Sequence, residues 1–202
     1  MKRVLCALIA AAILLCCIAA AETKVIRPMY VEMDLAQPED GIYYVAFDPS
    51  DIGDGMLKLA VYSQDCYDIA DIASLSIWDT IIVGDEAIVV VTLERDDDLM
   101  INGGLDEEGI NLRAYDEDNC WRVAMEDDYA SYTYRGDAVW LLDEEVSFTD
   151  GWDIESEPEV ITGADAVAKA IAGTEMEYFD PYCTAVRVEN GKIVEIERWY
   201  TP

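Results

Sequence analysis

Aromatic side chains are concentrated in one part of this 202-residue sequence. Two tryptophans and three tyrosines lie within twenty residues of each other, at Trp121, Tyr129, Tyr132, Tyr134 and Trp140. Tyr132 and Tyr134 are two positions apart, so their rings share one face of any β-strand that contains them. An exposed face of this kind is a flat platform for sugar rings or for a partner protein. Aromatic residues also fill sheet cores, and this second interpretation of the pattern stays open.

If the face is exposed, the expected binding residues are the aromatic side chains of this segment and one further tryptophan. They are Tyr132, Tyr134, Trp121, Trp140 and Trp78. The ligand expected for them is an extracellular protein or a glycan, because large rings contribute most of the contact area in both kinds of site.

Carboxylates are the other abundant chemical groups, with 43 Asp and Glu residues. A glycan hydrolase places two of them across the scissile bond, and an apolar pocket keeps one of the two protonated. Asp79 is the acid that the pattern favours, because it adjoins Trp78 at the start of an apolar run. The alternative role for Asp79 is that of a turn residue or strand-end cap.

Four acidic triplets begin ten residues apart, at 96–98, 106–108, 116–118 and 126–128. Calcium requires several carboxylate oxygens within one loop. In the EF-hand pattern alternating acids precede a glycine, but Cys120 and Trp121 stand where the third acidic ligand and the glycine belong. The loop at 48–54 is a weaker candidate. We interpret the triplets as solvated turns and assign no metal ligand, with a calcium-binding acidic protein kept as an alternative.

Several catalytic mechanisms are excluded by composition. The sequence contains no histidine, so no Ser-His or Cys-His pair exists. Gly103-Gly104 lacks the third glycine and the helix of a phosphate-binding loop. We therefore assign no catalytic residue and no cofactor, and the sequence argues against an enzyme. A carboxylate-dependent glycan hydrolase is the catalytic alternative.

The net charge of −30 restricts the partners further. A strongly acidic chain repels nucleic acids and anionic membrane surfaces, which proteins bind by neutralising phosphates with Lys and Arg. Cationic partners remain open. The charge itself is that of a protein that is soluble outside the cell, and a monomer is expected. The 52% hydrophobic content argues against a disordered chain.

The first 21 residues are expected to be a signal peptide that is removed. Lys2 and Arg3 precede an uncharged run that ends in Ala19-Ala20-Ala21, a small-residue cleavage site. Cleavage after Ala21 predicts a secreted protein that has no membrane attachment. Two alternatives are an uncleaved membrane anchor and lipidation of Cys17.

Three cysteines remain after cleavage: Cys66, Cys120 and Cys183. In an oxidising compartment any two of them can form a disulfide, and the sequence does not select the pair.

The strands and helices that position these residues follow from hydrophobic periodicity. Residues 80–94 contain two β-branched runs around Gly84-Asp85, which predicts a hairpin that is covered on both faces. Runs between the acidic triplets predict an antiparallel meander. Further strands are expected at 42–47, 56–63, 129–135, 138–142 and 145–148, with a turn at Gly136-Asp137.

Two short helices are expected, one within 67–75 and one at 163–172 with Thr162 as N-cap. Residues 22–202 then form a single domain, with a weak boundary near 153–160 where the sequence is least hydrophobic.

The chain ends in a hairpin around Asn190-Gly191. A three-residue loop that includes Glu189 would gather Val186, Val188, Val194 and Ile196 on one face, so we expect a type I turn with a G1 bulge. The fold class expected is mainly β and antiparallel, a small barrel or sandwich-like meander with two short helices. The function expected is that of a secreted, non-catalytic binding module.

Overall fold

The structure is a computed structural model that describes residues 23–200, apart from 31, 85, 96–98, 103–109, 116–119, 125–130 and 175–178. At 110–115, 120, 123 and 124 it describes the backbone only. The predicted signal peptide and the four acidic triplets therefore lie outside the described residues.

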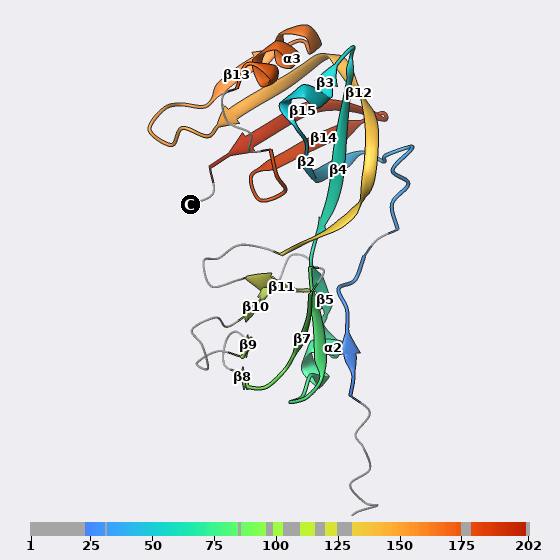
Figure 1. Ribbon diagram of the computed structural model, residues 1–202, viewed down its shortest axis with the longest axis vertical. Coiled ribbons are helices and arrows are strands. Elements are labelled where there is room, and N and C mark those ends of the chain that lie inside the picture. Colours follow the sequence, from blue (N-terminus) through green and yellow to red (C-terminus); the bar gives the residue numbers. More distant parts are fainter. Residues whose placement is uncertain are drawn as a thin grey trace, which may run out of the picture.

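The protein is mainly β, as predicted, and its described residues contain two α-helices. The strands form one large sheet and two smaller ones (Figure 1). The large sheet has the order β13-β12-β15-β14-β2-β4-β3. Its strands are β2 (Gly41–Ala46), β3 (Ile52–Gly53), β4 (Met56–Gln64), β12 (Tyr132–Gly151), β13 (Glu159–Thr162), β14 (Thr184–Glu189) and β15 (Lys192–Trp199).

The long strand β12 closes the large sheet on itself. Its first half pairs antiparallel with β4, from Tyr132 to Leu141, and its second half pairs parallel with β15, from Leu141 to Gly151. The strands β4, β12, β15, β14 and β2 therefore form a closed ring, which leaves no free edge between them. Apolar side chains from these strands pack on helix α3 (Ala164–Ala172), whose Val167 and Ile171 are fully buried.

The predicted turn at Gly136-Asp137 is wrong, because β12 is continuous through it. The register shifts between Tyr134 and Gly136, so the extra residue is accommodated as a β-bulge. Gly136 has a φ of 142°, and a Cβ there would lie 2.9 Å from Leu35 Cδ1. Only glycine meets both conditions without strain, which explains a turn-forming residue inside a strand.

The second part of the fold contains the two smaller sheets and helix α2 (Ile69–Ser74), below the large sheet in Figure 1. One sheet has the order β1-β6-β7 and the other β5-β11-β10-β9-β8, which confirms the predicted meander. The strands are β1 (Val25–Ile26), β5 (Cys66–Asp68), β6 (Thr80–Val83), β7 (Glu86–Val89), β8 (Leu93–Arg95), β9 (Leu99–Ile101), β10 (Ile110–Tyr115) and β11 (Cys120–Ala124). They surround a separate core that includes Tyr67, Ile72 and Ile81.

The predicted hairpin of residues 80–94 exists as β6 and β7, but it is not covered on both faces. In β6, Ile81 and Val83 are buried, whereas β7 is an edge strand and Val89 is 46% exposed. The larger core lies instead between the closed ring and α3. A continuous apolar run indicates that a strand can be buried, but it does not show whether the strand lies in the centre or at the edge of its sheet.

The C-terminal hairpin also differs from the prediction. Glu189 pairs with Lys192, so the loop has two residues, and Asn190 and Gly191 both have positive φ, at 53° and 74°. This is the type I′ geometry that suits a tight hairpin. The register then shifts after Val188 and Ile193, so that Val186 pairs with Ile196. A bulge within the strands, and not a longer loop, brings Val186, Val188, Ile193 and Ile196 onto the buried face. Ile193 therefore takes the place that was predicted for Val194, which is the extra residue at the bulge.

The two predicted helices are confirmed, with one difference at a cap. Asp68 caps α2, because its Oδ1 accepts the backbone N–H of Ala70 at 2.7 Å. Helix α3 has Gly163 as its N-cap, with a φ of 98° and no side-chain cap, and not the predicted Thr162. Residues 152–158, near the predicted weak boundary, connect β12 to β13, which pairs with it.

The two cysteines whose side chains the structure describes differ in chemical state. Cys66 is disulfide-bonded, and it lies in β5, which pairs with the β11 strand that contains Cys120. Cys183 is a buried thiol 3.4 Å from the carboxylate of Asp180, and its burial raises the pKa of that thiol. The sequence left the disulfide pair open; among the described side chains, Cys66 is in a disulfide and Cys183 is a thiol.

Asp65 joins the two parts of the fold. It lies between β4 and β5 and is 0% exposed. Its Oδ1 accepts the hydroxyl of Thr133 in β12 at 2.8 Å, and its Oδ2 accepts the backbone N–H of Gly84, between β6 and β7, at 2.5 Å. The backbone N–H of Asp65 donates to Ser131 O at 2.8 Å. A buried carboxylate requires such donors, so three segments that are distant in the sequence are held together at one point.

Tyr30 extends this joint to the N-terminal segment. Its hydroxyl donates to Thr133 Oγ1 at 2.7 Å and lies 3.2 Å from Asp65 Oδ1. Burial raises the pKa of Tyr30 to about 12, so the hydroxyl keeps the proton that it donates. The guanidinium of Arg135 lies over the ring, 4.1 Å from its centroid.

Replacing the carboxylate of Asp65 is expected to be costly. Asp65→Ala leaves the Gly84 N–H and the Thr133 hydroxyl without their acceptor in a buried site, which should lower the free energy of unfolding by about 3 kcal/mol. The exposed Glu157→Ala should change it by no more than about 0.5 kcal/mol. Urea denaturation measures both values. Equal stability of the two variants would contradict the role of Asp65 as a joint.

Candidate functional site

Three tyrosines lie side by side across neighbouring strands of the large sheet. Tyr44 in β2 pairs with Tyr62 in β4, and Tyr62 pairs with Tyr134 in β12. Directly paired residues of adjacent strands point to the same face of a sheet. The neighbouring Val45 and Val61 point the other way and are 0% exposed in the larger core. The tyrosines therefore form a row on the outer face.

Two more tyrosines extend this row. The ring of Tyr132 lies 4.9 Å from that of Tyr44, and the ring of Tyr182 lies 5.2 Å from that of Tyr132. Tyr62 and Tyr134 meet edge to face, with their centroids 5.7 Å apart. Tyr134 is 45% exposed and Tyr182 is 39% exposed. We refer to Tyr44, Tyr62, Tyr132, Tyr134 and Tyr182 as the tyrosine surface.

A groove continues from the tyrosine row along the same strands. Two positions beyond the tyrosines, Ala46 pairs with Ala60 and Ala60 pairs with Asp137. Alanine side chains are much shorter than tyrosine rings, so the surface is depressed there. The groove has a volume of about 490 Å³, in the size range of ligand sites. Lys58 and Asp51 lie at its other end, with Lys58 Nζ 3.6 Å from Asp51 Oδ1.

The tyrosine surface has acidic neighbours. Asp137 raises the pKa of Tyr134 through a hydrogen bond with its hydroxyl. Burial raises the pKa of Tyr182, and the charges of Asp180 and Asp65 add to this effect. Burial also raises the pKa of Tyr132. All three hydroxyls therefore keep their protons near neutral pH.

The structure brings together two of the five binding residues that the sequence predicts. Tyr132 and Tyr134 share the outer face, as expected. Trp140 is 2% exposed, and its indole N–H donates to Leu35 O at 2.8 Å within the larger core. Trp121 packs against the smaller core. Trp78 is 65% exposed but lies in the turn before β6, in the other part of the fold.

Tyr44, Tyr62 and Tyr182 are not among the binding residues predicted from the sequence. Alternation in 56–63 placed Leu57, Leu59 and Val61 on one face, so Tyr62 had to lie on the other. What could not be predicted is that β2 and β12 both lie beside β4, because these pairings join residues 14 or more positions apart. The alternation therefore predicts that Tyr62 faces outward, but it does not predict that Tyr44 and Tyr134 lie beside it.

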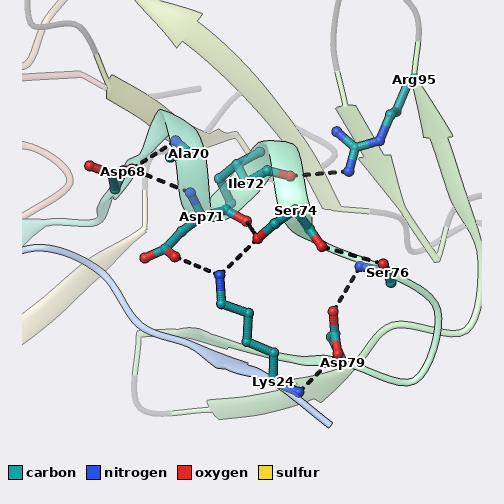
Figure 2. A network of polar contacts seen from close by, with 9 residues as sticks. All are labelled: Lys24, Asp68, Ala70, Asp71, Ile72, Ser74, Ser76, Asp79 and Arg95. Atoms are coloured by element: carbon teal, nitrogen blue, oxygen red, sulfur yellow. Dashed lines mark hydrogen bonds and ion pairs between the residues drawn. The ribbon is translucent and has the colours of Figure 1, made fainter. Parts of the chain in front are cut away.

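Asp79 is a structural residue in this fold (Figure 2). Its Oδ1 accepts the backbone N–H of Lys24 at 2.9 Å and its Oδ2 accepts that of Ser76 at 2.8 Å. Its own backbone also pairs with Ser76 and Val90. Both carboxylate oxygens are thus occupied by the main chain, which matches the turn role that the sequence analysis kept as the alternative.

The remaining contacts in Figure 2 hold helix α2 in place. Lys24 Nζ lies 2.6 Å from Asp71 Oδ1 and donates to Ser74 Oγ at 2.8 Å. Arg95 donates to the carbonyl oxygens of Ile72 and Leu75 at the end of the helix, at 3.1 and 2.9 Å. Arg95 thus gives hydrogen bonds to carbonyl groups at the C-terminal end of α2 and joins β8 to the helix. Lys24, which directly precedes β1, joins the N-terminal segment to it.

Other candidate sites receive no support from geometry. In the described parts of the chain, no three His, Cys, Asp or Glu side chains are grouped closely enough to hold a metal ion. In the 48–54 loop, Asp48 caps a short 3-10 helix (Pro49–Asp51) by accepting the N–H of Ser50 at 2.8 Å. None of the helices within the described residues is long and apolar enough to span a membrane.

Comparison with known proteins gives no family for this chain. No protein-family model matches the sequence, and no curated protein or solved structure matches it either.

The structural role of Asp79 can be measured. Asp79→Ala removes the acceptor for two backbone N–H groups, so it should lower the free energy of unfolding by about 1–2 kcal/mol. Glu86→Ala, at an exposed site in β7 of the same sheet, is the control and should change it by about 0.5 kcal/mol or less. Urea unfolding monitored by tryptophan fluorescence compares the two. No difference between them would show that the carboxylate does not hold this turn.

Proposed function

We propose that the protein is an exported, non-catalytic binding module whose ligand contacts the tyrosine surface and the adjoining groove. The observation that carries the proposal is the row of Tyr44, Tyr62 and Tyr134 on the outer face of three adjacent strands. We further infer that the closed ring of strands is a small barrel that serves as a rigid support for this surface.

The tyrosines are not needed to complete either core. The larger core lies on the opposite face of the same strands and is filled by aliphatic side chains and by Phe and Trp rings. Rings held side by side outside the core have few rotamers to lose on binding, and Tyr is enriched at protein interfaces for this reason. A partly exposed tyrosine cluster beside a groove therefore favours a binding surface.

A non-catalytic role is supported by the state of the nearby acids. Asp51 and Asp137 are the acids that line the groove, and Asp79, the acid favoured for a glycan hydrolase, lies in the other part of the fold. Asp51 is paired with Lys58, and Asp137 is exposed at the groove rim. A general acid must be buried in an apolar pocket to stay protonated near neutral pH. Neither acid meets that requirement, so the geometry favours binding over hydrolysis.

Export is supported by the N-terminal sequence and by the disulfide at Cys66. Structural disulfides persist in oxidising compartments and are rare in the reducing cytosol. An uncharged run preceded by Lys2 and Arg3 has the form of a cleavable signal. Both features are consistent with folding outside the cytosol.

Export predicts a specific mature N-terminus. Expression of the full chain in a secretion-competent host should release a protein that begins at Glu22, because cleavage follows Ala21. Intact-mass measurement with and without a reductant identifies the terminus and the disulfide at Cys66. A full-length product that stays in the membrane, or a lipid attached to Cys17, would contradict cleavage after Ala21.

If the ligand binds at the tyrosine surface, a double variant in two of its tyrosines should lose ligand affinity while it stays folded. The mature protein is tested on arrays of peptides and of glycans, and each ligand found is then titrated. Tyr62→Ala combined with Tyr134→Ala should weaken binding about 10- to 100-fold, because buried interface aromatics contribute most of the binding energy.

The control is Tyr200→Ala, which removes an exposed ring that packs on Trp152, outside the tyrosine surface. Thermal melting and circular dichroism establish that all variants are folded. If no ligand on either array distinguishes the double variant from the control, the proposed binding surface is wrong.

A further inference from the structure

We propose that the ligand of the tyrosine surface is a basic, lysine- or arginine-rich segment of another protein. This inference rests on the proposed function and adds the chemical class of the ligand. It combines the charge of the chain, the shape of the groove and the kinds of groups that line it.

The electrostatic field favours a cationic partner. The chain has 43 acidic and 13 basic residues. Such an excess of one sign attracts oppositely charged partners over several ångströms and raises their rate of association. Acidic groups also lie at the tyrosine surface itself: burial raises the pKa of Tyr182 and the charges of Asp180 and Asp65 raise it further, and the hydrogen bond with Asp137 raises the pKa of Tyr134.

The basic side chains near the surface already have acceptors. Lys58 is paired with Asp51, and Arg122 donates to Gln64 Oε1 at 2.9 Å. None of the ion pairs in the described part of the chain joins Asp137 to a lysine or arginine. Its carboxylate can therefore accept a charged group from a ligand while it remains hydrogen-bonded to the hydroxyl of Tyr134.

The groove fits a long basic side chain. Ala46 and Ala60 form its floor, and Ala138 and Val139 add apolar surface. An apolar floor suits the methylene stem of lysine or arginine, which packs on apolar surface while the charged end stays at a polar rim. Asp137 lies at that rim, and the rings of Tyr62 and Tyr134 lie beside it. Tyrosine ring faces attract ammonium and guanidinium groups.

The protein uses this pairing within its own fold. The guanidinium of Arg135 lies 4.1 Å from the ring centroid of Tyr30, and that of Arg198 lies 4.8 Å from Phe179. Arg198 also forms an ion pair with Asp150, with Nε 3.0 Å from Oδ1. An aromatic face next to a carboxylate therefore already binds a guanidinium in this chain.

A neutral glycan is less well matched to the groove. Sugars present many hydroxyls, and each buried hydroxyl needs a hydrogen-bond partner. The groove offers few side-chain partners: Asp137, and Asp51 and Lys58, which are paired with each other. Acidic glycans and nucleic acids are repelled by the charge of the chain.

The test titrates labelled peptide probes into the mature protein and follows fluorescence anisotropy. One probe alternates lysine and arginine with glycine and serine, a second has each basic residue replaced by glutamine, and a third is a neutral oligosaccharide. The basic peptide should bind at least tenfold more tightly than the glutamine peptide. Its affinity should fall at least tenfold as salt rises from about 20 mM to about 500 mM, because salt screens the attraction.

Matched charge variants separate the groove from the general acidity of the chain. Asp137→Asn should weaken binding of the basic peptide about fivefold or more. Asp165→Asn, an exposed acid of α3 outside the groove, makes the same change in net charge and should weaken it less than twofold. The Tyr62→Ala and Tyr134→Ala double variant should also lose affinity.

Three outcomes would overturn the inference: no binding of the basic peptide, equal binding of the glutamine peptide, or equal losses in the Asp137 and Asp165 variants. If a neutral oligosaccharide binds instead and the double tyrosine variant loses it, the basic ligand is wrong and the proposed binding surface stands. If the basic peptide binds and the double variant retains full affinity, both proposals fail.

Discussion

The buried carboxylate of Asp65 is the constraint on which the arrangement of this protein depends. A charge that is removed from water needs strong hydrogen-bond donors, and Asp65 receives them from Thr133 and from the Gly84 backbone. Thr133 lies between Tyr132 and Tyr134, and successive side chains of a strand point to opposite faces. By holding Thr133 on the inner side, Asp65 fixes both tyrosines on the outer side. The joint between the two parts of the fold therefore also orients the candidate binding surface.

A bulge in β12 gives the surface its second feature. The register shift between Tyr134 and Gly136 places Asp137 beside Ala60, where it forms the rim of the groove. The same strand then continues to pair with β15 and closes the ring. One irregularity thus brings a carboxylate next to the tyrosine row without ending the strand, as bulges near functional sites commonly do.

Two groups of described acids differ in their roles. Asp65, Asp68 and Asp79 accept backbone or hydroxyl donors and hold segments in place. Asp51 and Asp137 line the groove, where solvent and ligands can reach them. Composition gives only the number of acids, 43, and does not distinguish the role of one acid from that of another. Their roles depend on the hydrogen-bond donors that the fold brings to each carboxylate. The neighbouring Trp78 therefore could not show whether Asp79 is a catalytic acid or a turn residue.

The sequence by itself determined the β class, the two short helices, the presence of an antiparallel meander and the shared face of Tyr132 and Tyr134. These features depend on local periodicity and on caps such as Asp68, which act within a few residues. Only the tertiary structure decided that Trp140 is core, that Gly136 forms a bulge and that Tyr44 and Tyr62 complete the surface. Periodicity shows which side chains share a face, but pairing between distant strands depends on how the whole chain packs, and that pairing decides which face is buried.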